Sequence, residues 1–277
     1  MLRRPSLLVL LSWLAAGAGA IYAQAPSRAA KVSPTLTVRS AGSWKPVESG
    51  VEYRTIALER SEPAYSLELK LIRFDPRRIT PRIISSSDYQ LKSGDAKTLA
   101  QRSGAIATIN ANYFDEKGKP LALLKTAGRE INRSVSRHAL YTGVFAVRDS
   151  MPFITHRDDF QSAQAQEALQ SGPLLLNHGA VVQKMPGPGR YSRRAVIGVD
   201  KQQRVIIGVT DIILGGLSFT ELQELFSSPQ WQLETTDLLN LDGGGSAQLY
   251  LKTRALEEFV SGTSEVPVMI GFFKKAN

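Results

Sequence analysis

The stretch Leu238-Leu239-Asn240-Leu241-Asp242-Gly243-Gly244-Gly245-Ser246 decides more about this chain than any other segment. Its first four residues have the composition of a buried strand, and they lead directly into a carboxylate and three glycines. This order places Asp242 at the mouth of a sheet, where glycines let backbone N–H groups approach a sugar or an anion. Gly243, Gly244, Gly245 and Ser246 are therefore predicted to bind substrate. The alternative is a glycine-rich turn without a ligand.

Outward from this strand, the chain contains many strand patterns and few helix patterns. Apolar and polar residues alternate, or buried-type runs occur, at 52–58, 65–73, 194–200 and 204–210. Helices are predicted only at 96–102, at 159–170 and after a capping box at 218–221. Because strands and helices do not alternate regularly, we expect an α+β fold with a large, mainly antiparallel or mixed β-sheet flanked by a few helices.

The N-terminus has the composition of an export signal. Residues 1–23 combine basic Arg3 and Arg4, a short apolar run and small residues before Ala23. The run is short for a membrane span, with an uncleaved anchor as the alternative. Residues 24–50 are predicted to be a flexible leader and residues 51–277 one folded domain. We expect an exported protein, periplasmic or extracellular, without stable membrane insertion after signal removal.

Composition and net charge limit the kinds of chemistry and the kinds of partner that we expect. The chain has 277 residues, no cysteine and a formal net charge of +9, so disulfides, thiolate metal sites and thiol nucleophiles are excluded. The charge favours anionic partners such as phosphorylated glycans, whereas scattered basic residues without a reading motif argue against nucleic acid. The three histidines have no metal-ligand spacing and no cluster of carboxylates demands an ion, so neither a metal nor another cofactor is predicted, with a divalent ion at Asp242 as the alternative. The sequence carries no sign of the oligomeric state.

Four motifs in order resemble the phosphodiester glycosidase family. They are Ile109–Asp115, Ser171–Leu175, Arg193–Gly198 and Leu239–Leu249. Two departures occur: Ala111-Asn112 replaces a pair of small residues, and Arg194 stands where the family has Thr. The matches extend from about Gly104 to the C-terminus, whereas residues 51–103 carry no motif of the family.

The resemblance implies an exported hydrolase that cleaves the sugar–phosphate bond of glycosyl-1-phosphodiesters, on envelope or extracellular polysaccharide. Phosphate leaves readily without a proton, so a second carboxylic acid is less essential than in ordinary glycosidases. The site instead needs a base or nucleophile and a cation for the phosphate. Asp242 is the candidate for the first role, and Arg193 for the second, with Arg194 as its near alternative.

Several further residues of these motifs are candidates for contact with substrate. Asn110 is the third predicted catalytic residue, because it could bond sugar hydroxyls or an acetamido group. Asn112 could do the same or be a turn residue. Ser171 and Gly172 are expected to line the pocket. His178, in the loop after the second motif, is a candidate ligand and proton carrier, with a surface turn as the alternative.

Two other functions fit the same residues. A non-catalytic module that binds anionic polysaccharide would use the basic surface and the glycine loop without releasing sugar. A phosphodiesterase would instead cut the P–O bond. The hydrolase requires that four strand ends, which are far apart in the sequence, lie together at one cleft.

Overall fold

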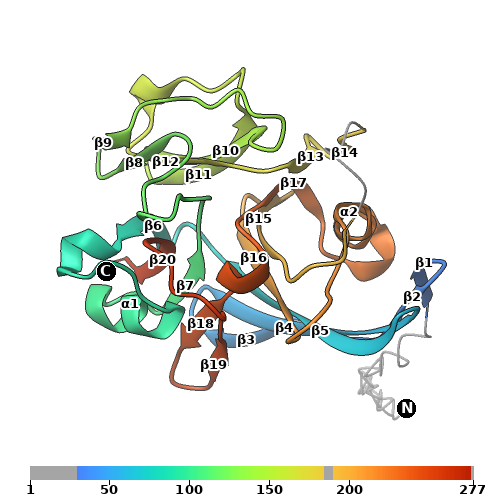
Figure 1. Cartoon of the computed structure of the whole chain (residues 1–277). Coiled ribbons are helices and arrows are strands. Elements are labelled where there is room, and N and C mark those ends of the chain that lie inside the picture. Colours follow the sequence, from blue (N-terminus) through green and yellow to red (C-terminus); the bar gives the residue numbers. More distant parts are fainter. Residues whose placement is uncertain (1–29, 184–189, 276–277) are drawn as a thin grey trace, which may run out of the picture.

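The computed structural model describes residues 30–183 and 190–275, and most of its regular structure is antiparallel β-sheet (Figure 1). This part of the chain contains two α-helices, α1 (Ala96–Ser103) and α2 (Phe219–Ser227). The prediction of an α+β fold with a large, mainly antiparallel sheet is confirmed.

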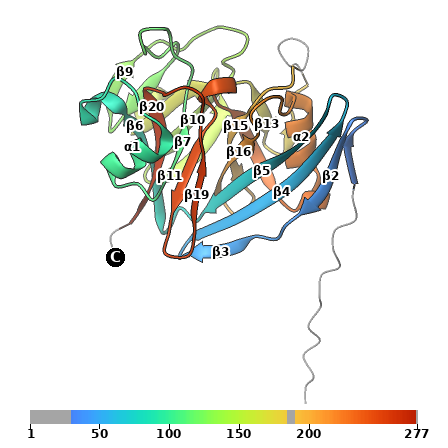
Figure 2. The ribbon, with the colours of Figure 1, turned by 60° about the horizontal axis from the view of Figure 1, so that its bottom comes forward.

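The largest sheet has ten strands, in the order β1-β2-β4-β5-β16-β15-β17-β13-β14, with β3 paired to β4. Its strands are β1 (Ala30–Ser33), β2 (Leu36–Ala41), β3 (Lys45–Glu48), β4 (Val51–Ser61), β5 (Ala64–Phe74), β13 (Leu174–Asn177), β14 (Ala180–Val181), β15 (Ala195–Asp200), β16 (Val205–Asp211) and β17 (Thr235–Asn240). The β4–β5 hairpin extends from the side of β18 and β19 towards α2 (Figure 2).

Two five-stranded sheets complete the architecture. The second sheet has the order β11-β10-β12-β8-β9 and the third β19-β18-β7-β20-β6. Their strands are β6 (Ile79–Ser85), β7 (Ala107–Asn110), β8 (Leu124–Thr126), β9 (Arg129–Asn132), β10 (Gly143–Arg148), β11 (Met151–His156), β12 (Glu167–Ser171), β18 (Leu249–Lys252), β19 (Glu257–Val260) and β20 (Val268–Lys274).

All three sheets bury side chains in one hydrophobic core. Ile197 of the large sheet, Phe145 of the second and Ile109 of the third are fully buried members of the same apolar cluster. Each sheet needs a partner for its apolar face, and here the three faces cover one another. The three sheets are therefore held together by a common core.

Local sequence signals account for both helices. Asp95 accepts a hydrogen bond from the Thr98 N–H at the start of α1, and Gly104 ends this helix in the left-handed conformation. Ser218 and Glu221 form the predicted capping box of α2. Helix α2 then covers the large sheet with apolar side chains such as Leu222.

Two expectations about local structure are wrong. Residues 30–48 are not a flexible leader but form β1, β2 and β3, because Leu36 and Val38 are buried and β2 pairs with β4. Residues 159–170 are not a helix: Ser162–Gln164 form a short 3-10 turn, and β12 follows. Pairing of β12 with both β10 and β8 overrides the helical composition.

The predicted signal peptide, residues 1–23, lies outside the described residues, as do residues 24–29 of the predicted leader. Within the ranges that the structure describes, no helix combines the length and the apolar character needed to cross a bilayer.

Candidate active site

Segments that lie far apart in the sequence meet at the C-terminal end of β17. The Asp242 N–H donates to the carbonyl of Ala111, just after β7, at 3.0 Å. The Asn240 N–H donates to the carbonyl of Pro173, just before β13, at 3.1 Å. Strand β15, which follows the pair of arginines, is the sheet neighbour of β17. All four motifs of the sequence therefore converge on one place.

The Asp242 carboxylate is held by the loop that follows it. The Gly243 N–H donates to Oδ1 at 2.9 Å, and the Ser246 side chain forms a second hydrogen bond. Burial raises the pKa of Asp242 from 3.8 to about 6, against the lowering effect of these two bonds. The groups that set this pKa include no cation. The result is a carboxyl group that changes charge close to neutral pH.

Asn110 holds the backbone on both sides of the glycine loop. It is fully buried, its Nδ2 donates to the Asp242 carbonyl at 2.7 Å, and its Oδ1 accepts from the Gln248 N–H at 3.1 Å. Both ends of the amide are therefore occupied by protein. This geometry makes Asn110 a positioning residue rather than the sugar ligand that the sequence suggested.

The main effect of the three glycines is to allow close packing of the loop, rather than to leave N–H groups free for a ligand. The Gly244 N–H donates to the Arg193 carbonyl at 2.9 Å, and the Ser246 N–H donates to the Gly243 carbonyl at 3.2 Å. A Cβ atom at Gly243 would lie 2.8 Å from the Arg193 carbonyl oxygen, and one at Gly245 would lie 2.7 Å from Thr263 Oγ1. The loop therefore serves mainly to seat Asp242.

The Arg193 side chain holds the end of the glycine loop through hydrogen bonds to the backbone. Its buried guanidinium donates through Nη2 to the carbonyls of Ala247, at 2.7 Å, and Ser261, at 2.5 Å. Burial lowers its pKa. Nη2 is thus committed to backbone carbonyls and gives Arg193 a loop-holding role, while its buried Nε has no hydrogen-bond partner among the described residues.

Arg194 presents one nitrogen to the loop. Its Nε donates to the Leu217 carbonyl at 2.8 Å and its Nη2 to the Arg190 carbonyl at 2.6 Å. Nη1 makes no hydrogen bond to the described residues, and a Cβ atom at Gly243 would lie 4.0 Å from it. Arg194, the alternative that the sequence kept open, therefore also places a guanidinium nitrogen beside the glycine loop.

Two tyrosines lie near Asp242. The Tyr113 hydroxyl donates to the Gly172 carbonyl at 3.0 Å and accepts from Asn240 Nδ2 at 3.1 Å. The ring of Tyr141 lies 5.0 Å from that of Tyr113. Burial first, and the charge of Asp242 second, raise the pKa of both phenols. Tyr141 lies outside the four motifs, so the sequence carried no signal for it.

Ser171, Gly172 and Asn112 form the wall behind these tyrosines. Ser171 is fully buried, and Asn112 donates to the Tyr113 carbonyl at 3.0 Å. Among the described residues, Ser171 Oγ and Asn112 Oδ1 have no hydrogen-bond partner. A Cβ atom at Gly172 would lie 1.9 Å from the Leu140 carbonyl oxygen, so only glycine fits where the chain around Leu140 crosses.

The structure does not bring His178 into this group. His178 follows β13, and its N–H donates to Asp237 Oδ1 at 2.8 Å. Asp237 precedes Asp242 by five residues on β17, so His178 lies at the other end of that strand. Its side chain is 80% exposed. In the described ranges, no three His, Asp or Glu side chains are grouped to hold a metal ion.

The chain belongs to the phosphodiester glycosidase family, whose sequence profile matches residues 103–273, more than half of its length. The match begins at the end of α1 and includes all four motifs that converge at β17. No curated protein matches the sequence at a significant level.

Solved structures share the fold. The catalytic domain of zebrafish N-acetylglucosamine-1-phosphodiester alpha-N-acetylglucosaminidase, auto-inhibited by its pro-peptide, has a TM-score of 0.65 and 14% identity, over 87% of this chain and 89% of that one. A hypothetical protein from Synechocystis has a TM-score of 0.58 and 15% identity, over 83% and 64%. A protein of Burkholderia pseudomallei K96243, presumed to be exported, has a TM-score of 0.51 and 11% identity, over 75% and 74%.

Proposed function

We propose that this protein is a hydrolase that cleaves the bond between the anomeric carbon of a sugar and the phosphate of a glycosyl-1-phosphodiester. The observation that carries the proposal is the buried Asp242 carboxylate, seated by Gly243 and Ser246 where the family's four motifs converge. Membership of the phosphodiester glycosidase family supports the same reaction class.

Asp242 supplies the base. Water attacks the anomeric carbon and gives its proton to the carboxylate, while the bond to phosphate breaks and its electron pair leaves with the phosphate oxygen. Attack by Asp242 itself, followed by hydrolysis of the glycosyl ester, releases the same sugar and phosphomonoester, with retention instead of inversion at the anomeric carbon. With a pKa of about 6, the carboxyl is mostly ionised at neutral pH and still accepts a proton readily.

Arg194 supplies charge for the leaving phosphate through Nη1, the nitrogen beside Gly243. Arg193 and Asn110 act indirectly, because they hold the backbone that carries Asp242. Tyr113 and Tyr141 offer ring faces next to the carboxylate, where a sugar ring could rest.

The substrate and setting of this reaction are proposed from the family and from the sequence. We expect export through residues 1–23 and action on envelope or extracellular polysaccharide, without nucleic acid and without a cofactor. The fold that the chain shares with the presumed exported protein of B. pseudomallei agrees with this setting.

The decisive experiment compares wild type, lacking residues 1–23, with Asp242→Asn on a panel of sugar-1-phosphodiesters. We expect free sugar from wild type and a loss of turnover of about 10³-fold in the variant, because the base or nucleophile is gone. Asp88→Asn, an exposed surface carboxylate paired with Arg129, is the matched control. Equal turnover in wild type and Asp242→Asn would remove Asp242 from the mechanism.

The same assay separates the alternatives. In ¹⁸O-labelled water, the label enters the sugar if the anomeric carbon is attacked, and enters the phosphate if the protein is a phosphodiesterase. A non-catalytic module would bind phosphorylated polysaccharide saturably and release no sugar over long incubation.

A further inference from the structure

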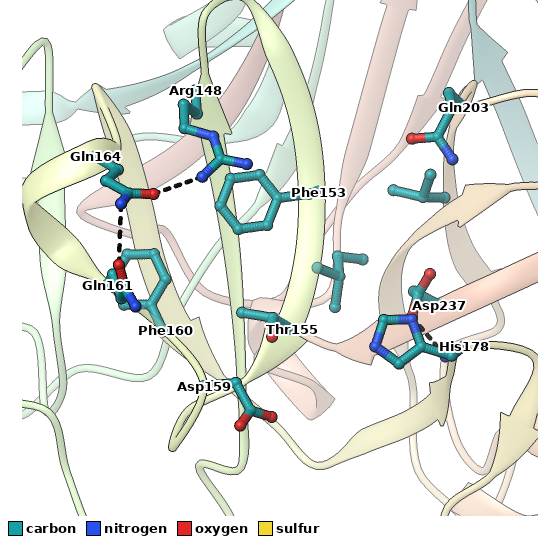
Figure 3. Close-up of a pocket in the computed structure, with 12 residues that line it drawn as sticks. Arg148, Phe153, Thr155, Asp159, Phe160, Gln161, Gln164, His178, Gln203 and Asp237 are labelled. Carbon is teal, nitrogen blue, oxygen red and sulfur yellow. Dashed lines mark hydrogen bonds and ion pairs between the residues drawn. The ribbon is translucent and has the colours of Figure 1, made fainter.

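A hollow lies between the second sheet and the large sheet, towards the end of β17 remote from Asp242. Figure 3 shows one wall carrying Arg148, Phe153 and Phe160, and the facing wall carrying Gln203, Asp237 and His178. The groove has a volume of about 450 Å³, within the range of small-molecule binding sites. His178, which the candidate active site leaves unused, therefore lines a site of its own.

The lining combines aromatic faces with planar polar groups. Phe153 is half-buried, and the Arg148 guanidinium lies 5.4 Å from its ring centroid. Gln161 and Gln164 lie on the same wall as the rings, where the Gln164 amide donates to Gln161 Oε1 at 2.9 Å, and Gln203 lies on the facing wall (Figure 3). A pyranose ring presents an apolar C–H face and a rim of hydroxyl groups, so it matches rings flanked by amides and carboxylates.

The charge of the groove distinguishes it from the rest of the protein. Its lining contains one arginine, Arg148, and two carboxylates, Asp159 and Asp237. The chain as a whole carries a net charge of +9. A polyanion is therefore not favoured here, whereas hydroxyl groups can donate to both carboxylates.

The groove is aligned with the candidate active site. Asp237 and Asp242 are five residues apart along β17, which corresponds to at most ~17 Å at strand spacing. On the second sheet, Thr155 lines the groove, and the next residue, His156, pairs with Gly143. Gly143 in turn pairs with Ser171 in the wall of the active site. The groove and the candidate active site thus lie on the same paired strands, with Gly143 packed against Leu174 and Leu239 between them.

We infer that this groove is an accessory subsite that binds an uncharged stretch of a glycan chain whose phosphodiester reaches Asp242. The inference rests on the proposed function for the nature of the reacting bond, while binding in the groove is independent of catalysis. It identifies the substrate class as an oligosaccharide or polysaccharide rather than a single sugar on a phosphate.

The backbone of His178 is held at the edge of the groove by a hydrogen bond. Its N–H is bonded to Asp237 Oδ1, its φ is +50°, and the side chain remains 80% exposed. Figure 3 shows the imidazole beside Asp237, across the groove from Thr155. The floor between the walls includes the aliphatic side chains of Ile154 and Val199, whose methyl groups can report on a ligand.

The test measures binding without turnover, in the Asp242→Asn chain lacking residues 1–23. The methyl NMR signals of Ile154 and Val199 are followed during titration with tetraacetylchitotetraose and, separately, isomaltotetraose. We expect saturable shifts with at least one of the two, and little effect of the matching monosaccharides. Because the catalytic carboxylate is absent, this result does not depend on whether the wild type is a hydrolase.

Neighbouring glutamines provide a matched pair of variants. Gln203→Ala is expected to weaken binding about fivefold, as for the loss of one hydrogen bond. Gln202→Ala is expected to leave it unchanged, because Gln202 bonds Arg204 outside the groove. Gln161→Ala offers a second position should Gln203→Ala fold poorly, because Gln161 Nε2 makes no hydrogen bond to the described residues. Absence of shifts with both tetrasaccharides, equal effects of the two neighbouring variants, or preference for a phosphorylated polymer would overturn the inference.

Discussion

Two aspartates near opposite ends of β17, Asp237 within it and Asp242 just after it, have similar first contacts and different surroundings. Asp237 accepts from the His178 N–H at 2.8 Å and from the Thr236 hydroxyl at 2.9 Å. Asp242 likewise accepts from one backbone N–H, that of Gly243, and forms one bond with a hydroxyl side chain. Local hydrogen bonds therefore do not distinguish the two carboxylates.

What differs is the packing around each end. The Asp242 end is enclosed by the glycine loop, Asn110 and Tyr113, and burial there raises the pKa of the carboxyl to about 6. The Asp237 end opens to a groove beside the exposed His178. One end is thus suited to proton transfer and the other to ligand binding.

The largest difference in stability is expected between two glycine-to-alanine variants, one near each end of β17. Gly172→Ala places a Cβ atom 1.9 Å from the Leu140 carbonyl oxygen, so we expect a loss of more than about 3 kcal/mol of unfolding free energy. At Gly179, φ is +80° with nothing within 4 Å, and alanine should cost only about 1 kcal/mol. Urea unfolding measures both. Equal losses would contradict the difference in packing.

The raised pKa of Asp242 predicts a pH-dependent gain in stability for Asp242→Asn. The folded-state pKa exceeds the unfolded value of 3.8, so this group favours folding below pH 4, and the contribution is lost as pH rises through 6. At pH 8 the variant should be more stable than wild type by about 2–3 kcal/mol, relative to the difference at pH 4. The same difference at both pH values would argue against the raised pKa.

The two adjacent arginines should respond differently to lysine. Arg194→Lys removes the nitrogen beside Gly243, and we expect kcat/KM for a sugar-1-phosphodiester to fall about tenfold, mainly through KM. Arg193→Lys loses its bonds to Ala247 and Ser261 and should lower the melting temperature and kcat together. Steady-state kinetics and thermal unfolding separate these outcomes. The reverse pattern would restore Arg193 as the phosphate ligand.

The smallest effect is expected from removing the hydroxyl group that forms a hydrogen bond with each carboxylate. The Ser246 bond lowers the pKa of Asp242, so Ser246→Ala should move the acid limb of the kcat/KM profile upward by less than about one pH unit. Activity then falls at pH 6, and the difference from wild type narrows towards pH 8. Thr236→Ala removes the corresponding hydroxyl at the Asp237 end and should not move this limb.

Much of the fold was predictable, because strand alternation and helix caps are local. The capping box at Ser218, the helix at 96–102 and the strands at 194–200 and 204–210 were all predicted correctly, to within a residue or so at their ends. The failures, 30–48 and 159–170, lie where strand pairing with distant segments overrides local composition. The four motifs also predicted which segments would converge.

The sequence by itself determined that Asp242 follows a buried strand, that close-packing glycines come after it, and to which family the motifs belong. Only the tertiary structure decided the direction in which individual side chains point. Successive strand residues face opposite sides, so neither the roles of Arg193 and Arg194 nor the contacts of Asn110 follow from order along the chain. Likewise, the antiparallel pairing of β13 with β17 carries His178 away from Asp242 and into the groove.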